Sequence, residues 1–228
     1  EYVDECIGLF KQQPQVNQKM LNDVLTQIIE GQTFDLNYFN AKNGEIKSLK
    51  NEEQLDFYIY SVAGCVGKFW TKLCQHYFKN YSSLTEDKLI ELAINFGKGL
   101  QLTNILRDIK ADFILSRCYL PIFQDEKIDI HSLINKKNLL EQYRLKTLKY
   151  LENGFYYTQS IKIKRIKFAC FIPIFIGMKT LKKLENFDYL KSKDVAKISR
   201  KEVYLIIYLS LRSCFSFKFA KSVLKKLS

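Results

Sequence analysis

Residues that interrupt helices are scarce in this chain. Its 228 residues include three prolines and nine glycines, and the stretches between them carry few of the turn signals that separate short strands. Hydrophobic residues make up 47% of the chain, enough to bury a large core. We therefore expect an all-α protein, folded as a single domain over residues 1–228, and not a disordered chain.

Histidine is rare, and the cysteines lack the spacing of a metal site. There are two histidines and six cysteines, with no CxxC pair among them. This pattern argues against a structural zinc site and against a disulfide framework. Most of the cysteines have apolar neighbours, which is typical of small buried side chains in a reducing compartment. We therefore expect a cytoplasmic protein.

No long hydrophobic run is present. The longest nearly unbroken one, Phe168 to Met178, is too short for a membrane span, which needs about 20 helical residues. No signal peptide opens the chain. The first residues, Glu1 to Cys6, contain neither a methionine nor a helix cap, so we expect the chain to begin inside an element, with preceding helices missing.

The chain is strongly basic, with a formal charge of +12 and a pI near 9.3. Such a charge attracts nucleic acid, lipid head groups or a phosphorylated small substrate. Solvated helix faces explain most of the lysines, and a basic surface facing a membrane is the main alternative. A nucleic-acid binder should concentrate lysines and aromatic residues on one element, so we expect no nucleic-acid partner. The basic clusters are Lys162, Lys164, Arg165 and Lys167, and Lys218, Lys221, Lys225 and Lys226.

Apolar residues three and four apart predict a series of long helices. Gly31 is expected to stop the first of them, and Thr85 to cap the third. Pro173 is expected either to kink its helix or to cap the start of it. Polar loops are predicted over 34–50, with a turn at Asn43-Gly44, over 117–121, and over 193–201. The predicted helices span residues 16–29, 52–78, 86–112, 137–159, 163–185 and 200–226.

A polar stripe runs along the predicted helix over 86–112. At about 100° per residue, Gln101, Asn104, Asp108 and Asp112 fall on a stripe about 80° wide, flanked by apolar residues. Mg²⁺ prefers oxygen ligands and keeps waters that substrate phosphates can replace. The stripe therefore outlines a diphosphate site. An exposed, acidic helix end is the common alternative for an aspartate pair alone.

Small residues interrupt the predicted helix over 52–78. Ala63, Gly64 and Gly67 lie within two turns of each other, and glycine inside a helix is unfavourable unless something approaches closely. Either a neighbouring helix or a bound molecule satisfies that condition.

Two segments resemble the squalene/phytoene synthase family. Gln101 to Asp112, QLTNILRDIKAD, followed by RCYLP at 117–121, is similar to the family's second aspartate-rich signature. Tyr58 to Gly67, YIYSVAGCVG, is similar to its YCYxVAGxVG segment. The sequence departs at Ser116, where the family usually has glycine, and at Ala111, where an acidic residue is frequent. The likeness extends over essentially the whole chain but is diagnostic only in these two segments.

This resemblance implies an isoprenoid synthase-type helical bundle around a central apolar cavity. It also implies a head-to-head prenyltransferase that condenses two prenyl diphosphates, farnesyl diphosphate foremost, to squalene or a squalene precursor. Phytoene or dehydrosqualene synthesis at the same site is the alternative. Two or three Mg²⁺ ions, a possible NADPH, a monomeric state and a peripheral membrane position are also implied. A non-catalytic relative acting as an assembly factor would have lost the aspartates.

The resemblance further assigns roles to individual residues. It makes Tyr58, Arg107 and Arg117, with Asp108 and Asp112, catalytic. Arg107 remains either an ion-pair partner of Asp108 or a diphosphate contact. Asp4 belongs to Glu1-Tyr-Val-Asp-Glu, which is similar to the end of the family's first aspartate motif. The implied metal ligands are Asp4, Asn104, Asp108 and Asp112, and the implied substrate-binding residues are Val62, Ala63, Val66, Gly67, Leu100, Gln101 and Asn104.

Overall fold

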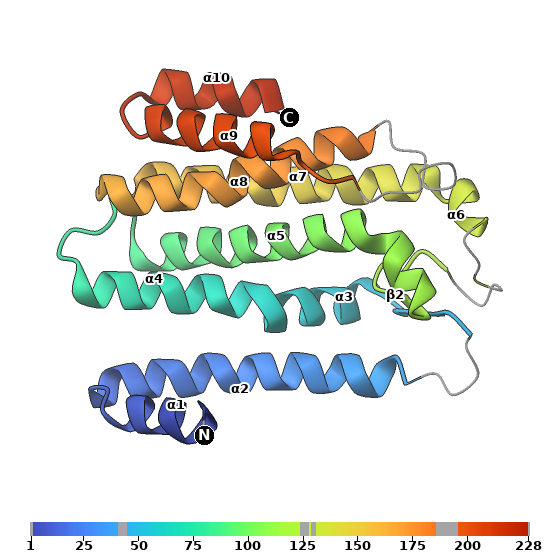
Figure 1. The fold of residues 1–228 in the computed structure, drawn as a ribbon, viewed down its shortest axis with the longest axis horizontal. Helices are drawn as coiled ribbons and strands as arrows, with labels where there is room; N and C mark the ends of the chain where they lie inside the picture. Colours follow the sequence, from blue (N-terminus) through green and yellow to red (C-terminus); the bar gives the residue numbers. More distant parts are fainter. Residues whose placement is uncertain (1, 41–44, 124–127, 129–130, 186–195, 228) are drawn as a thin grey trace.

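The computed structural model describes residues 2–40, 45–123, 128, 131–185 and 196–227. Long helices dominate this part of the chain, as the sequence predicts, and the fold is all-α (Figure 1). The helices are α1 (Tyr2–Lys11), α2 (Gln15–Tyr38), α3 (Glu52–Ile59), α4 (Cys65–Tyr77), α5 (Glu86–Ile114), α6 (Ser132–Asn135), α7 (Lys137–Ser160), α8 (Lys164–Glu185), α9 (Arg200–Ser213) and α10 (Phe217–Leu227), with a π-helical turn, η1 (Tyr60–Gly64), between α3 and α4.

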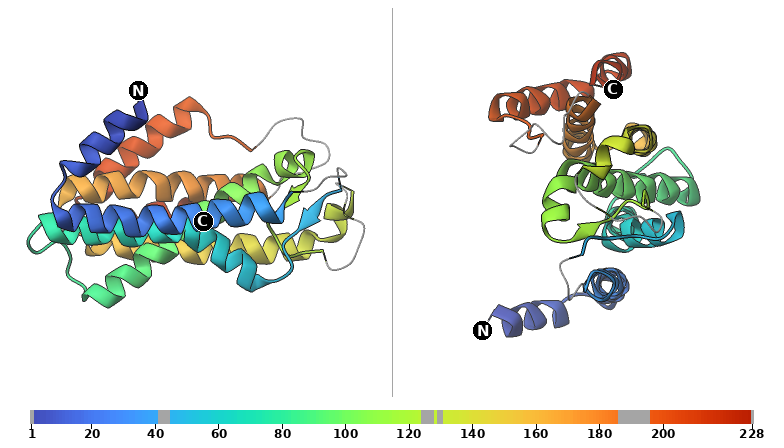
Figure 2. Two further views of the ribbon diagram at one scale, coloured as in Figure 1. Left: turned by 90° about the horizontal axis from the view of Figure 1, so that it is seen from below. Right: turned by 90° about the vertical axis from the view of Figure 1, so that its right-hand side faces the viewer.

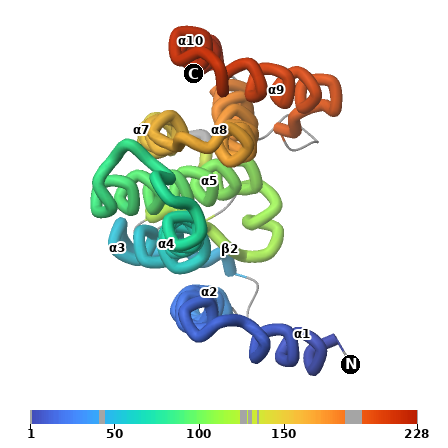
Figure 3. The backbone as a smooth tube through the Cα atoms, turned by 90° about the vertical axis from the view of Figure 1, so that its left-hand side faces the viewer, coloured from blue at the N-terminus to red at the C-terminus, as the bar shows by residue number. Residues whose placement is uncertain are grey.

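The helices stack as layers around α5. Figures 1 and 3 show α1 and α2 at one edge, then α3 and α4, then α5, then α7 and α8, with α9 and α10 at the opposite edge. Two short strands, β1 (Lys47–Ser48) and β2 (Arg117–Cys118), pair in parallel beside the C-terminal end of α5 (Figure 2). This pairing ties the segment after α2 to the segment after α5.

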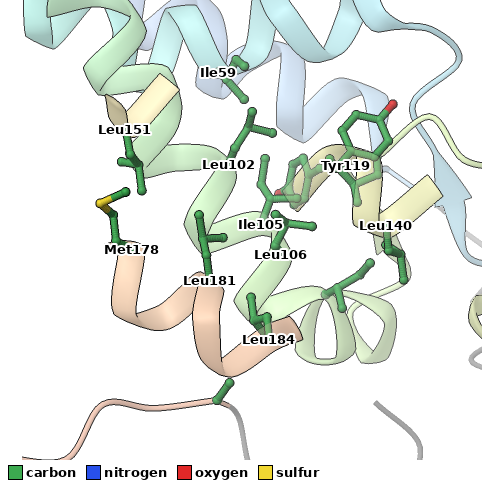
Figure 4. Close-up of a cluster of buried hydrophobic side chains, with 14 of the residues drawn as sticks. Ile59, Leu102, Ile105, Leu106, Tyr119, Leu140, Leu151, Met178, Leu181 and Leu184 are labelled. Atoms are coloured by element: carbon green, nitrogen blue, oxygen red, sulfur yellow. The ribbon is translucent and has the colours of Figure 1, made fainter. Parts of the chain in front are cut away.

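The core lies along the inner side of α5. Leu102, Ile105 and Leu106 are almost fully buried, and they belong to one cluster with Ile59 of α3 and with Met178 and Leu181 of α8 (Figure 4). Burial of such side chains contributes about 1.5–3 kcal/mol each. The opposite flank of the same helix carries Asn104 and Asp108, so this packing fixes the direction in which the polar stripe faces.

Gly31 does not stop a helix, contrary to the expectation. Helix α2 continues through it to Tyr38. A Cβ atom at Gly31 would lie 2.7 Å from the Cβ of Ser61, below any normal contact distance. Glycine is therefore needed here because α2 crosses η1 closely, and the helix extends well into the segment predicted as the loop 34–50.

The other boundaries agree with the predictions to within about two residues, with three corrections. The helix over 52–78 contains the unpredicted π-helical turn. Arg117 and Cys118 form β2 inside the predicted loop. Thr85 occupies the N-cap position of α5 without a side-chain capping hydrogen bond. Of the two roles open to Pro173, its position inside α8 excludes that of capping the start of the helix. The Asn43-Gly44 turn, and residues 193–195 of the predicted polar segment, lie outside the described residues.

The predicted last helix over 200–226 is two helices. Helix α9 ends at Ser213, and α10 begins at Phe217. Ala220, Val223 and Leu227 are buried on one face of α10. One continuous helix would carry these residues away from the protein, so their burial favours the turn.

Ser116 adopts a left-handed conformation, with φ of 61°. This geometry explains why glycine is usual at this position in the family that the sequence resembles, because a Cβ disfavours it by about 1–2 kcal/mol. We expect Ser116→Gly to raise the free energy of unfolding by about 1 kcal/mol, whereas Ser116→Ala should not. Urea denaturation of the two variants tests this, and equal effects of glycine and alanine would contradict it.

Candidate active site

The acidic pair of α5 lies where the helix leaves the core. Asp108 is about one third exposed, and Asp112, one turn later, is half-buried. Burial, followed by the negative charge of Asp108, raises the pKa of Asp112 to about 6, and Arg117 opposes the shift. Crowded carboxylates of this kind are stabilised by a bound cation, which favours their charged forms.

Arg107 forms an ion pair with Asp108. Its Nε donates to Oδ1 at 2.9 Å and its Nη2 to Oδ2 at 2.5 Å, and this bond raises the pKa of the guanidinium. Of the two roles left open by the sequence, the structure shows the ion pair. The guanidinium therefore covers the carboxylate on one side.

Four residues from other parts of the chain gather near Asp112. Arg117 of β2 donates from Nη1 to Oδ2 of Asp35 at 3.0 Å, and the Tyr119 hydroxyl donates to Oδ1 of Asp35 at 2.7 Å. The Tyr119 ring stacks on Tyr58, with centroids 4.7 Å apart. Burial raises the pKa of the Tyr58 phenol, and the charges of Asp35 and Asp112 add to this. The structure thus brings Tyr58, Asp108, Asp112 and Arg117 into one neighbourhood.

Asp35 is the residue that the sequence analysis missed. It follows Gly31 by one helical turn, so both lie on the same face of α2. The spacing of Gly31 and Asp35 indicates a site residue only once α2 is known to cross η1 at Gly31. From the sequence alone, the segment after residue 34 is predicted to be a polar loop.

The small residues of η1 and α4 allow close helix packing. A Cβ at Gly67 would lie 2.1 Å from the carbonyl oxygen of Ala93, and one at Gly97 would lie 2.3 Å from that of Ala63. These contacts show that the first explanation from the sequence, a neighbouring helix, applies.

The same segment also borders a cavity, so the second explanation is not excluded. The cavity has a volume of about 380 Å³, within the usual range of ligand pockets. Val66 and Trp70 are 40% and 42% exposed, so the cavity opens to solvent on the α4 side. Its lining, almost entirely apolar, consists of Val62, Ala63, Val66, Gly67, Trp70, Ala93, Phe96, Gly97, Leu100, Tyr157, Ala169, Cys170 and Pro173.

The cavity and the acidic pair share one face of α5. At 100° per residue, the lining residues Ala93, Gly97 and Leu100 and the polar residues Asp108 and Asp112 lie within a sector of about 120°. Leu100 and Asp108 are separated by about 12 Å along the helix axis. The acidic pair therefore lies beyond the Leu100 end of the cavity, on the same side of α5.

Two further predicted site residues of α5 lie in the same sector, Asn104 exposed and Gln101 half-buried. Another predicted site residue lies apart. Asp4 is exposed on α1, and Figure 1 shows α1 at the outer edge, away from α5. Within the described residues, no three His, Cys, Asp or Glu side chains are close enough together to hold a metal. The pair Asp108 and Asp112 still suits Mg²⁺, which commonly takes one or two carboxylates and completes its shell with phosphate and water.

An all-α fold in which an apolar cavity and a carboxylate pair lie along one face of α5 is the arrangement that the sequence resemblance implies. Residues 5–202 match the model of the squalene/phytoene synthase family. The chain therefore belongs to the squalene/phytoene synthase family.

Relatives and a solved structure agree with this assignment. A presqualene diphosphate synthase from Zymomonas mobilis is 34% identical over 59% of this chain and 42% of its own length. A bifunctional lycopene cyclase/phytoene synthase from Phycomyces blakesleeanus is 30% identical over 52% of this chain and 18% of its own. The structure of TcSQS with the ligand BPH1237 superposes with a TM-score of 0.74 at 20% identity, covering 96% of this chain and 62% of that one. The matches thus span less than half the length of these two relatives.

Proposed function

We propose that the chain catalyses, or forms the catalytic part of a protein that catalyses, head-to-head condensation of two prenyl diphosphates. The observation that carries the proposal is that the apolar cavity and the carboxylates of Asp108 and Asp112 lie along the same face of α5. An apolar cavity suits a prenyl chain, and a cation held by carboxylates suits a diphosphate. Farnesyl diphosphate is the proposed substrate, and a longer prenyl diphosphate leading to phytoene is the alternative.

The proposed reaction joins two allylic molecules and releases one diphosphate. The C–O bond of the first substrate breaks, and the double bond of the second attacks the resulting cation. Loss of one proton closes a cyclopropylcarbinyl diphosphate, which is the stage named for the presqualene diphosphate synthases among the relatives. In this proposal, Asp108 and Asp112 hold Mg²⁺, and the stacked rings of Tyr58 and Tyr119 present an aromatic face that can stabilise the cation.

Bound Mg²⁺ would supply Lewis-acid stabilisation of the departing diphosphate. Arg117 adds a guanidinium, whose geometry suits phosphate oxygens. The apolar lining of the cavity keeps water from the cation. No feature in the described part of the chain supports NADPH, and the proposed reaction ends before any reduction step.

Product analysis tests this function. The protein is incubated with Mg²⁺ and either farnesyl or geranylgeranyl diphosphate, and the extracted products are identified by mass spectrometry. We expect a cyclopropylcarbinyl diphosphate or its hydrocarbon product from one substrate, and none after chelation of the metal. Absence of any condensation product with both substrates would count against the proposal.

We also propose that the protein binds anionic membranes through the surface of α9 and α10. Large apolar side chains on this surface are exposed, with Tyr204 at 70% and Phe215 at 66%. Helices α9 and α10 carry seven basic residues and a single acidic one, Glu202, which pairs with Lys179 and Lys183 of α8. Basic and aromatic side chains together suit the head-group region of an anionic bilayer. The exposed apolar residues are Tyr204, Leu205, Ile207, Tyr208, Leu211, Phe215 and Phe217.

Charge distinguishes this surface from the other apolar one. Helices α1 and α2 also expose large apolar residues, but they carry five acidic and two basic side chains. An anionic bilayer therefore favours α9 and α10. Among the described residues, no helix combines the length and the apolar content that crossing a bilayer requires.

Vesicle sedimentation tests the membrane proposal. We expect binding to vesicles containing phosphatidylglycerol and weak binding to phosphatidylcholine alone. The double variant Lys218→Glu/Lys221→Glu should bind at least tenfold more weakly, because each basic residue near the surface contributes about 1 kcal/mol. The matched variant Lys11→Glu/Lys19→Glu should bind like the wild type. Equal losses in both variants, or no preference for anionic lipid, would overturn the proposal.

A further inference from the structure

Asp35 occupies a central place among the charged and aromatic residues near Asp112. Its side chain is only 14% exposed, and both of its carboxylate oxygens are used. One accepts from Arg117 at 3.0 Å and the other from Tyr119 at 2.7 Å. One carboxylate on α2 thus holds two side chains of the segment that follows α5.

The surrounding contacts fix Asp35 itself. The Tyr38 hydroxyl donates to the carbonyl oxygen of Ser48 at 2.8 Å, and Lys47 Nζ donates to the carbonyl oxygen of Tyr38 at 2.7 Å. These bonds join the C-terminal end of α2 to β1, and β1 pairs with β2. The close crossing at Gly31 sets the rest of α2. Asp35 therefore reaches the site from a well-defined direction.

Arg117 lies near two carboxylates, those of Asp35 and Asp112. It lies near enough to Asp112 to act on it through its charge, yet its Nη1 donates to Asp35 at 3.0 Å and to the Tyr119 hydroxyl at 3.4 Å. A guanidinium paired directly with Asp112 would neutralise that carboxylate and compete with a cation for its oxygens. Pairing with Asp35 leaves the oxygens of Asp112 to other partners.

We propose that Asp35 is a positioning residue for diphosphate binding, which acts by holding Arg117 and Tyr119 in place and keeping Arg117 away from Asp112. The inference rests on the proposed function, since it concerns the same site. Asp35 does not touch the diphosphate in this scheme. It sets where the guanidinium meets the phosphate oxygens and how the Tyr119 ring stacks on Tyr58.

The test is calorimetric titration of inorganic diphosphate in the presence of Mg²⁺. We expect Asp35→Asn to weaken diphosphate binding at least tenfold, and Asp23→Asn, an exposed carboxylate on the same helix, to leave it unchanged. Asp35→Glu should restore part of the affinity, because it keeps the charge. Circular dichroism establishes that each variant is folded at the titration temperature.

Tyr119→Phe, which removes one of the two bonds to Asp35, provides a milder variant if Asp35→Asn fails to fold, and should also weaken binding.

A double-mutant cycle with Arg117→Gln separates positioning from a general structural role. If Asp35 acts through Arg117, Asp35→Asn should cost much less diphosphate affinity in the Arg117→Gln background than in the wild type, and the remaining loss is the part that acts through Tyr119. Additive losses, or unchanged binding by a folded Asp35→Asn variant, would overturn the inference while the proposed function stands. A wild-type protein that binds no diphosphate would overturn the proposed function, and this inference with it.

Discussion

Asp112→Ala should lower turnover of the prenyl diphosphate by roughly 1000-fold, the size of effect seen when one electrostatic contact to a developing charge is removed. Fold stability should not fall with it. Burial raises the pKa of Asp112 to about 6 in the folded protein. Above pH 6 the buried charge of Asp112 therefore lowers the free energy of unfolding, whereas below the pKa of Asp112 in the unfolded chain it has no such effect. Removing the carboxylate at neutral pH should therefore leave stability unchanged or increase it. Steady-state kinetics and urea denaturation measure the two effects, and Asp108→Ala should lose activity similarly.

Asp87→Ala is the matched control for this experiment. Asp87 is an exposed aspartate in the first turn of the same helix, far from the acidic pair. Its replacement should leave turnover within about twofold of the wild type, because charges on a solvated surface are screened over about 10 Å. Wild-type turnover in a folded Asp112→Ala variant would contradict the metal role.

Gly67→Ala should destabilise the protein by about 3 kcal/mol, the upper part of the usual range for overpacking. The new Cβ would lie 2.1 Å from the carbonyl oxygen of Ala93. A backbone atom inside α5 cannot move away without disturbing that helix. Helix propensity alone would favour alanine by about 1 kcal/mol, so the sign of the change depends on the tertiary contact. The free energy of unfolding in urea measures it.

Gly8→Ala provides the opposite case. Gly8 lies inside α1, and nothing would come within 4 Å of an added Cβ. Alanine should therefore raise stability by up to about 1 kcal/mol, as propensity predicts. If Gly67→Ala raised the free energy of unfolding as Gly8→Ala does, that result would contradict the close packing of α4 on α5.

The helices were predictable because their signals are local. Apolar spacing and the scarcity of proline determined α5, α7 and α8 to within about two residues. The errors arose at residues whose meaning depends on distant partners. Gly31 looks like a helix stop in the sequence, but it is a crossing point with Ser61. The break between α9 and α10 reflects burial of Ala220 and Val223. No local sequence pattern predicts that break.

The site was predictable along α5 and incomplete elsewhere. Helical geometry places Asp108 and Asp112 on one stripe, and that relation needs only the sequence. The ion pair of Arg107 was one of two open alternatives, because both directions are compatible with a helix edge. Asp35 lies 82 residues before Arg117, its partner, and nothing in its neighbours indicates a site.

The sequence by itself determined the family, the helical character and the acidic stripe of this protein, because each of them depends on residues only a few positions apart in the chain. The tertiary structure alone decided which glycines serve helix packing, where the cavity lies relative to the carboxylates, and that Asp35 holds Arg117. The physical reason is that these features are contacts between helices, whose distances depend on how the whole chain packs.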